Sequence, residues 1–254
     1  MEILKPNWPA PENISAFITT RKGGLSLSPW SSNNFSLSVG DNIKSVEKNW
    51  RLLSQEISLP SPPQLLDQVH GANIVQATCD GSTVIGDGSF TKKSRIVCSV
   101  ITADCLPILI CDVYGTLVAS IHAGWRGLSA GIVTNLIKQL NVCPDDLMAY
   151  LGPAISQKNF EVGHEVKRAF LNGCHSIDLE KKVSSCFVRV KQKKVYQDEK
   201  WRASLYDLAK IHLNENNVFK IYGGDSCTYD DSERFYSYRR DGNTGRMASL
   251  IWFS

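Results

Sequence analysis

Two reactive side chains stand at the outer ends of a predicted pair of core strands. Residues 102–127, TADCLPILICDVYGTLVASIHAGWRG, have an apolar middle, and their ends carry Cys105 and His122. The tetrapeptide DVYG, with Asp first and Gly fourth, favours a tight turn between the strands. In a hairpin closed by that turn, Cys105 would face His122 at the open end, with Cβ atoms roughly 4.5–5.5 Å apart.

A cysteine and a histidine at this spacing can do two kinds of chemistry. They can share one zinc ion, at Zn–S ~2.3 Å and Zn–N ~2.0 Å, or they can form a catalytic dyad in which the thiol attacks the substrate. The alternative without function is a core thiol beside a strand-end histidine. The neighbouring residues favour function, because Asp104 precedes the cysteine and HAGWRG supplies two glycines and Arg126. Glycine lets the backbone approach a ligand closely, and arginine offers a planar fork for anions.

A catalytic zinc site needs a third protein ligand. Such sites hold the metal with three side chains and keep one position open, and Cys plus two His is one known set. Of the five histidines, three lie on or beside predicted helices and are expected at the surface, namely His164, His175 and His212. His70, in QVHGAN directly before a glycine, is the predicted third ligand. The ligand atoms of His70, Cys105 and His122 should then lie within ~4 Å of one another.

Apolar spacing and turn residues predict the elements that must position these side chains. Apolar stripes predict helices over residues 45–57 and 128–140, a terminal glycine predicts one over 165–173, and a capping box at Ser204 begins a fourth. Short β-branched or aromatic segments predict strands over residues 14–20, 95–102, 107–113, 115–121, 147–152, 186–190, 219–224, 235–240 and 247–253. The basic run over residues 181–200 is interpreted as a strand with a solvated face. Because helices and strands interleave unevenly, we expect one mixed α/β (α+β) domain over residues 1–254.

The composition narrows the class of partner. The 28 basic and 25 acidic residues leave a net charge of +3, too small to predict nucleic acid or a membrane surface as the partner. The N-terminus lacks the basic and apolar regions of a secretory signal, and no stretch reaches the ~18 apolar residues of a membrane span. We therefore expect a cytoplasmic protein whose eight cysteines are mostly free thiols.

Motifs along almost the whole chain resemble one family. TTRKGG, VGDN, QVHGANIV, TADCLPILICD, IHAGWRGL, LGPAI followed by FEVG, and FYSYRRDGNTGRMASLIW occur in the order of the laccase-domain family. These are the YfiH-like proteins, once called polyphenol oxidases and now regarded as purine nucleoside phosphorylases. The resemblance implies a fold like that of bacterial cytotoxic necrotizing factors, with β-sheet layers flanked by helices, and it implies His70, Cys105 and His122 as metal ligands. Two positions depart from the family pattern, since Trp50 replaces a usual Arg and Phe35 a usual Leu.

The resemblance implies two activities. One is phosphorolysis of adenosine, inosine, guanosine and methylthioadenosine, and the other is hydrolytic deamination of adenosine. For deamination, zinc can lower the pKa of water toward ~7, so that hydroxide attacks C6 of adenine. A carboxylate must then move protons. Asp104, beside the predicted ligand Cys105, could do so or could orient a ligand instead, and Glu161 in FEVG is the second carboxylate considered.

Phosphorolysis also requires a bound phosphate, and arginine suits phosphate best. Arg21 in TTRKGG and Arg126 beside the HAGW motif are predicted anion contacts. Arg126 would also stand near a helix N-terminus, where backbone N–H groups favour anions. Arg239 and Arg240 would point to opposite sides of a predicted strand, so at most one of them should face the site. Arg240 is the candidate, and the sequence does not decide firmly between it and Arg239.

Several kinds of function compete. The first is a zinc-dependent purine nucleoside phosphorylase with adenosine deaminase activity, with purine nucleosides and phosphate as its small-molecule partners. The second is a Cys–His hydrolase or amidase in which Cys105 attacks without a metal, and the third is a copper-dependent polyphenol oxidase. Copper has the least support, because a blue-copper site uses a weak axial ligand such as Met and no methionine stands beside a predicted ligand in the sequence. A non-enzymatic binding module is disfavoured by a metal site with an open position.

Overall fold

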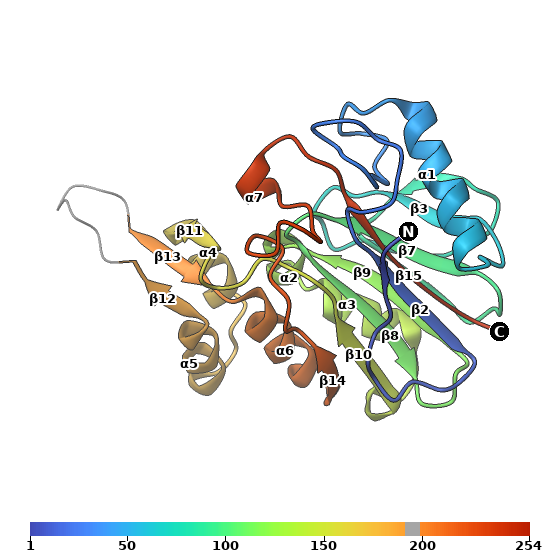
Figure 1. Cartoon of the computed structure of the whole chain (residues 1–254). Coiled ribbons are helices and arrows are strands. Elements are labelled where there is room, and N and C mark those ends of the chain that lie inside the picture. The colour runs from blue at the N-terminus through green and yellow to red at the C-terminus, as the bar shows by residue number, and fades with distance from the viewer. Residues whose placement is uncertain (191–198) are drawn as a thin grey trace.

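The computed structural model describes residues 1–190 and 199–254, and its centre is two six-stranded sheets packed face to face (Figure 1). The first sheet has the order β1-β2-β15-β7-β3-β5, formed by β1 (Ile3–Leu4), β2 (Ile14–Thr19), β15 (Met247–Phe253), β7 (Val97–Thr102), β3 (Pro63–Asp67) and β5 (Thr83–Ile85). The second has the order β14-β10-β8-β9-β6-β4, formed by β14 (Lys220–Gly223), β10 (Leu147–Leu151), β8 (Leu106–Asp112), β9 (Val118–Ala123), β6 (Gly88–Thr91) and β4 (Ile74–Gln76).

Alternation of side chains along the strands builds the core between the sheets. In β8, Leu109 and Cys111 pack with Ile18 and Ile251 of the first sheet. Ile110 points to the opposite face and joins a second apolar cluster. Every residue of β8 is buried, because both of its faces are covered. This explains why its sequence is a continuous apolar run rather than an alternating one.

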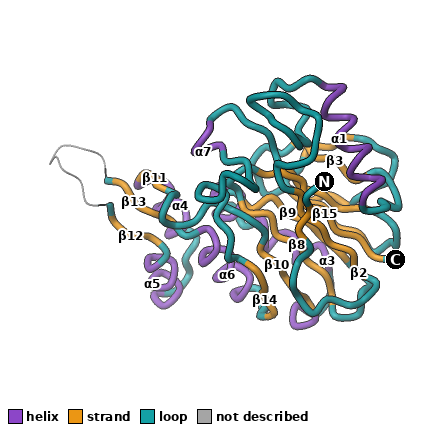
Figure 2. Tube along the Cα trace, in the orientation of Figure 1, coloured by secondary structure: helices purple, strands orange, loops and turns teal. Residues whose placement is uncertain are grey.

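Helices cover both outer faces and give four layers in the order helix, sheet, sheet, helix. α1 (Ile43–Glu56) packs Leu53 against Leu250 and Trp252 of the first sheet. Against the second sheet lie α2 (Trp125–Ser129), α3 (Ile132–Leu140) and α6 (Leu205–Glu215). Figure 2 shows α1 and α6 separated by the strands. The predicted mixed α/β class, with β-sheet layers flanked by helices, is confirmed.

A smaller three-stranded sheet lies beside this centre (Figure 1). It has the order β11-β13-β12, formed by β11 (Glu161–Gly163), β13 (Lys200–Ala203) and β12 (Phe187–Arg189), and it carries α4 (His164–Leu171) and α5 (Ile177–Ser185). Val166, Phe170 and Val183 of this lobe belong to the same apolar cluster as the second sheet, so the core continues into it. The remaining elements are η1 (Pro144–Asp146) and α7 (Tyr238–Asp241). None of the described helices has the length and apolar character needed to cross a bilayer.

Most predicted elements are confirmed, and the differences have local causes. α1, α4 and α6 lie where expected, and Ser204 caps α6. The single helix predicted over residues 128–140 is two helices, because Gly131 adopts φ +84° between them. Residues 235–240 were expected as a strand but lead into α7, which Ser237 caps. The basic run divides between α5 and β12, and its residues 191–198 lie outside the described residues.

The hairpin of β8 and β9 keeps the predicted turn but has a longer loop. The Gly115 amide donates to the Asp112 carbonyl at 3.3 Å, as DVYG predicts. However, the Asp112 carboxylate also accepts the amides of Thr116 and Leu117, at 2.7 and 3.1 Å, and this extends the loop. The register therefore places Pro107 opposite His122, and the prediction that Cys105 directly faces His122 is wrong. Because the shift is two residues, the two side chains stay on one face of the sheet, diagonal to each other.

Candidate metal centre and cavity

The three predicted ligands meet at one end of the space between the two sheets. The ligand atoms of His70, Cys105 and His122 all lie within 4.8 Å of one another. This separation is slightly wider than the ~4 Å expected for ligands that share one zinc ion. The two imidazole rings are inclined at 76°. Among the described residues, this is the one group of three or more His, Cys, Asp or Glu side chains with metal-site spacing.

Cys105 and His122 stabilise each other's charged forms. Burial raises the pKa of the Cys105 thiol, but the neighbouring His122 and His70 outweigh burial and lower that pKa to about 6. Burial lowers the pKa of His122, but Cys105 and Asp87 outweigh burial and raise that pKa to about 9. The thiolate, which is the metal-binding form of cysteine, is therefore favoured at neutral pH.

Asp87 holds two of the predicted ligands and was not found from the sequence. Its Oδ1 accepts hydrogen bonds from Nδ1 of His122 at 2.8 Å and from the amide of His70 at 2.9 Å. Its Oδ2 accepts a hydrogen bond from the amide of Gly71 at 2.6 Å. Burial opposes its ionisation, but these hydrogen bonds outweigh burial and lower the pKa of its carboxyl. The sequence signal was present, since Asp87 stands between two glycines, Gly86 and Gly88, at the start of β6.

His70 lies in a loop that is held at both sides. β3 ends before Gln68, whose side chain accepts the Ile101 amide at 2.8 Å and donates to the Ile101 carbonyl at 2.9 Å. His70 itself has φ +60°, in the left-handed region, and its amide is bound by Asp87. The two hydrogen bonds between Gln68 and Ile101, together with the carboxylate of Asp87, thus fix a strained turn that directs His70 toward the other two predicted ligands.

The donor set suits zinc. One thiolate and two imidazoles are ligands that zinc prefers, and three protein ligands leave a fourth position open. Because Asp87 occupies Nδ1 of His122, the Nε2 lone pair is the one available to a metal. A carboxylate on the other ring nitrogen is the usual way in which proteins orient a zinc-binding histidine. His70, Cys105 and His122 could therefore hold a zinc ion.

The three predicted ligands lie in the wall of a cavity of about 520 Å³, within the ~300–1,000 Å³ typical of small-molecule sites. The remaining wall includes two aromatic side chains, two carboxylates and two arginines, namely Phe160, Tyr238, Asp67, Asp104, Arg239 and Arg246. A smaller cavity of about 280 Å³ shares the part of the wall formed by Leu66, Asp67 and Gln68, so the two spaces are neighbours.

Asp104 lies in this wall, but protein donors engage its carboxylate. Its Oδ1 accepts Oγ1 of Thr228 at 2.6 Å, and its Oδ2 accepts Oγ of Ser237 at 3.0 Å and the amide of Arg239 at 2.6 Å. Its backbone has φ +90°, which is rare for a residue with a side chain. With three donors on the carboxylate, the geometry favours a positioning role over the acid–base role considered from the sequence.

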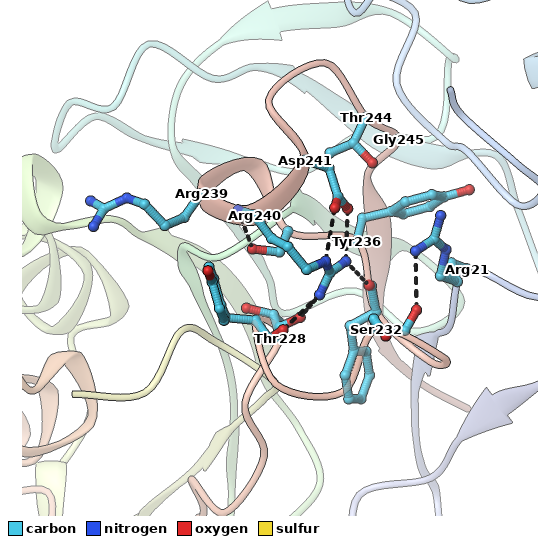
Figure 3. Close-up of polar contacts among 12 residues, drawn as sticks. Arg21, Thr228, Ser232, Tyr236, Arg239, Arg240, Asp241, Thr244 and Gly245 are labelled. Atoms are coloured by element: carbon cyan, nitrogen blue, oxygen red, sulfur yellow. Dashed lines mark hydrogen bonds and ion pairs between the residues drawn. The ribbon is translucent and has the colours of Figure 1, made fainter. Parts of the chain in front are cut away.

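The structure does not bring Arg21 or Arg126 to the cavity wall. Nη1 of Arg21 donates to the Ser232 carbonyl at 3.0 Å, and its guanidinium lies 4.9 Å from the ring centre of Tyr236 (Figure 3). Arg126 is exposed, and its guanidinium lies 4.4 Å from the ring centre of Trp125 in the first turn of α2. Both arginines therefore pack on neighbouring aromatic rings.

Arg240 is also absent from the cavity wall, because the protein uses all its donor nitrogens. Nη1 donates to the carbonyls of Thr228 and Tyr229, both at 2.8 Å. Nε and Nη2 donate to the Asp241 carboxylate at 2.8 and 2.7 Å, and Nη2 also reaches the Phe235 carbonyl (Figure 3). The expected substrate contact at Arg240 is thus a structural clamp of the loop before α7.

Two other arginines line the cavity in place of the predicted three. Arg239 extends away from Arg240 (Figure 3), because α7 is a helix rather than the predicted strand. Arg246 stands directly before β15 and was missed. No local signal in the sequence indicates its place, because it reaches the site through the pairing of Met247 with Thr102 at the end of β7, close in sequence to Cys105.

The remaining sequence candidates lie away from the ligand cluster. The carboxylate of Glu161 is not part of the wall, but the Glu161 carbonyl accepts Nη1 of Arg239 at 2.8 Å. Of the histidines expected at the surface, His164 and His175 are exposed. His212 is half-buried against Phe170, and burial lowers its pKa. All eight cysteines are free, as expected.

The departure at Trp50 does not alter the wall of the larger cavity. Nε1 of Trp50 donates to the Phe35 carbonyl at 3.1 Å, and the two rings lie 4.8 Å apart in an edge-on arrangement. Neither residue lines the cavity of about 520 Å³, although Phe35 lines the smaller one. The two unusual residues therefore pack on each other and join α1 to the loop before it.

Comparisons with known proteins extend over the whole chain. A family model described as multi-copper polyphenol oxidoreductase laccase matches residues 15–254. A purine nucleoside phosphorylase of Haemophilus influenzae is 41% identical to this chain over 253 residues, and the match covers 100% of both chains. A purine nucleoside phosphorylase of Pseudomonas aeruginosa is 43% identical over 250 residues, and the match covers 98% of this chain and 97% of the relative. A crystal structure of a Neisseria meningitidis protein, described as family DUF152, has a TM-score of 0.89 at 42% identity over 100% of each chain. The chain therefore belongs to the laccase-domain family, in which both of these bacterial relatives are named purine nucleoside phosphorylases.

Proposed function

We propose that the chain is a zinc-dependent purine nucleoside phosphorylase with adenosine deamination as a second activity. Its substrates would be adenosine, inosine, guanosine or methylthioadenosine together with phosphate. The observation that carries this proposal is the group of His70, Cys105 and His122 in the wall of a cavity of nucleoside size. The names of the two relatives, both purine nucleoside phosphorylases, support the phosphorolysis reaction.

Zinc is proposed rather than copper. When bound, zinc supplies Lewis acidity without redox chemistry. A blue-copper site would add a weak axial ligand such as methionine. The sulfur of Met247 already accepts the Tyr236 amide at 3.1 Å, and Met148 packs in the core between the sheets. These positions give no support to a copper site.

Phosphorolysis is a displacement at C1′ of the ribose. Hydrogen phosphate forms a new C1′–O bond while the C1′–N9 bond breaks, the bonding electrons leave with the purine, and the proton of hydrogen phosphate ends on the base. The rings of Phe160 and Tyr238 offer faces for the purine. Asp67 suits the ribose hydroxyls, because its carboxylate accepts no hydrogen bond from the described residues. Holding both reactants in place can lower the barrier by ~7–11 kcal/mol.

Deamination of adenosine would use the same cavity. The oxygen of water replaces the amino group at C6, and ammonia leaves. This reaction needs a group that moves protons. Asp67 suits that task better than Asp104, because protein donors already engage the carboxylate of Asp104.

A metal-free Cys–His hydrolase is the second candidate, and the charge state of Cys105 favours it. A thiolate beside a protonated imidazole is also the resting state of many cysteine nucleophiles. The pKa values of about 6 for Cys105 and about 9 for His122 match that description. Asp87 would then orient the histidine as the third member of a triad does.

Metal analysis combined with chelation and alkylation separates these candidates. The proposal predicts about one zinc ion per chain in protein purified without added metal. It also predicts loss of phosphate-dependent base release after complete chelation, with recovery on addition of zinc. Activity that survives chelation but is lost when Cys105 is alkylated would support the hydrolase. About one copper ion per chain together with oxidation of phenols would support the oxidase.

The free cysteines suggest where these reactions take place. All eight thiols are unpaired in the structure, and thiols persist in reducing compartments. We therefore propose a cytoplasmic location, where nucleosides and phosphate are both available. Fractionation of the native cells would test it, with the protein expected in the cytoplasmic fraction and its recovery from an extracytoplasmic fraction overturning it.

A further inference from the structure

Two arginines are the cations of the cavity wall. Apart from the histidine ligands, the described residues that line the cavity include no other basic side chain than Arg239 and Arg246. They come from α7 and from the residue before β15, on the same cavity wall as Cys105 and His122. Neither forms an ion pair with a carboxylate among the described residues. Both guanidinium groups therefore lie in the cavity wall without a carboxylate of the described residues at ion-pair distance.

The unused donors of Arg246 are free to meet a ligand. Its Nη1 donates to the carbonyls of Thr244 and Gly245, at 2.8 and 3.0 Å, which fixes the plane of the guanidinium. Nε and Nη2 make no hydrogen bond to the described residues. The group is half-buried, and burial lowers the pKa of its guanidinium, although the nearby charges of Cys105 and Asp104 partly offset this effect. A fixed guanidinium with spare donors is suited to an anion.

Arg239 is arranged in the same way, whereas its neighbour Arg240 is not. Nη1 of Arg239 donates to the Glu161 carbonyl at 2.8 Å, and its guanidinium lies 5.4 Å from the ring centre of Phe160. Its Nε and Nη2 make no hydrogen bond to the described residues, whereas every donor nitrogen of the Arg240 guanidinium is used (Figure 3). Arg239 is thus oriented by the protein but keeps donors for a ligand.

Asp104 fixes Arg239 relative to the ligand cluster. Its carboxylate accepts the Arg239 amide at 2.6 Å, and the next residue in the chain is Cys105. The bonds from Thr228 and Ser237 complete this attachment and leave the carboxylate oxygens engaged. Asp104 therefore places the guanidinium-bearing helix beside the thiolate without neutralising the guanidinium itself.

We propose that Arg239 and Arg246 form the phosphate-binding subsite of the cavity, with Asp104 as the positioning residue that holds Arg239 beside Cys105. This rests on the proposed phosphorylase function, because phosphorolysis requires phosphate next to C1′ of the nucleoside. The planar fork of arginine matches two oxygens of phosphate, which lysine does not. The assignment replaces Arg21, Arg126 and Arg240, which do not line the cavity.

The test is direct binding of inorganic phosphate by titration calorimetry, together with steady-state kinetics, on metal-replete protein. Arg239→Gln and Arg246→Gln should each weaken phosphate binding by about 10–100-fold, because each removes charged hydrogen bonds. The KM for phosphate should rise by a similar factor, while the KM for nucleoside and the zinc content stay the same. Arg126→Gln, at an exposed arginine outside the cavity, is the matched control and should change none of these values.

Two milder substitutions test the same subsite if a glutamine variant does not fold. Arg246→Lys keeps the charge but removes the fork, so it should still raise the Kd for phosphate. Asp104→Asn should raise the KM for phosphate more than the KM for nucleoside. Unchanged phosphate affinity in the folded arginine variants, or a rise confined to the KM for nucleoside, would overturn the subsite.

Phosphate binding and nucleoside cleavage separate an error in the subsite from an error in the proposed function. If no nucleoside is cleaved but phosphate binding still depends on both arginines, the proposed function fails and the anion subsite stands. If phosphate-dependent cleavage is normal in Arg239→Gln and Arg246→Gln, the proposed function stands and the subsite fails.

Discussion

Asp87 connects the ligand cluster to the rest of the protein at the scale of single residues. One carboxylate orients the ring of His122 and holds the turn that carries His70, so two of the three proposed ligands depend on it. Cys105 depends on its neighbours in another way, since His122 and His70 lower the pKa of its thiol to about 6. The cluster is therefore organised before a metal binds, which reduces the cost of ordering the ligands.

Asp87→Asn should weaken zinc binding without unfolding the protein. The amide keeps the shape of the side chain but loses the charge that supports His122, and the loss of such a partner typically lowers metal affinity by about 10–100-fold. Competition with a chromophoric chelator would measure the effect. Asp80→Asn, at an exposed carboxylate outside the cluster, is the control. Equal zinc affinity in the wild type and Asp87→Asn would show that Asp87 does not orient the ligands.

Cys105→Ala should lose both bound zinc and phosphate-dependent cleavage, because it removes the one thiolate of the site. Cys105→Asp should retain part of each, since a carboxylate can bind zinc at ~2.0–2.2 Å. Metal analysis and base release are measured on the same samples, and Cys143→Ala, at an exposed thiol, is the control. A Cys105→Ala variant that still binds about one zinc ion per chain would contradict the assignment of Cys105 as a ligand.

The residue types at the site were partly readable from the sequence. His70, Cys105 and His122 follow from residue type, turn position and the family motifs. Asp87 and Arg246 were missed because their roles depend on which loops meet at the end of the sandwich. The glycines on either side of Asp87 mark its loop, but they do not indicate its partners. The choice between Arg239 and Arg240 depended on whether residues 235–240 form a strand or lead into a helix.

At the scale of elements, the turn after β8 decides how the ligands face each other. Asp112 binds the amides of Thr116 and Leu117, which lengthens the loop by two residues relative to the predicted turn. A change of the loop length by an odd number of residues would have moved His122 to the helix-covered face of the sheet. A change by an even number keeps His122 between the two sheets. The three side chains therefore lie together although the predicted register was wrong.

Gly124 is the position where the end of β9 and the start of α2 meet Cys105. A Cβ atom there would lie 3.0 Å from Sγ of Cys105 and 3.5 Å from Cδ2 of His70. Gly124→Ala should therefore displace the thiolate and lower zinc affinity, with a larger loss for Gly124→Val. The control is Gly173→Ala, where the nearest atom to the added Cβ is the Phe170 carbonyl oxygen at 3.6 Å.

Chelator competition and thermal denaturation together measure the effect of Gly124→Ala. The backbone at Gly124 has φ −67°, which alanine adopts freely, so the change in the free energy of unfolding should stay below about 1 kcal/mol. A loss of stability with unchanged zinc affinity would mean that the added methyl group disturbs the packing of α2 rather than the metal site.

At the scale of the whole molecule, the site lies where the layers end. The four layers bury both strands of the hairpin, and the cavity forms at one end of the space between the two sheets. The layer class was predictable because the strands and helices have clear apolar patterns. The partition into two facing sheets was not, because it depends on pairings between strands far apart in the sequence, such as β15 with β2 and β7.

The expectation of one domain over residues 1–254 also belongs to this scale. Because the apolar cluster of the second sheet includes Val166, Phe170 and Val183, the lobe should unfold together with the centre. Far-UV circular dichroism and tryptophan fluorescence should then give coincident urea transitions. Of the six tryptophans, Trp201 lies in the lobe and Trp252 in the first sheet, so the summed fluorescence includes both parts. Two separated transitions would mean that the lobe is an independent unit.

The formation of ribose 1-phosphate tests the central claim most directly. Purified, zinc-replete protein is incubated with adenosine or inosine and inorganic phosphate, and the products are followed by phosphorus NMR and by chromatography of the bases. The proposed function predicts equal amounts of free purine and ribose 1-phosphate, absent without phosphate and absent with Cys105→Ala. Release of base without ribose 1-phosphate, or turnover that is independent of phosphate and unaffected by Cys105→Ala, would contradict the assignment.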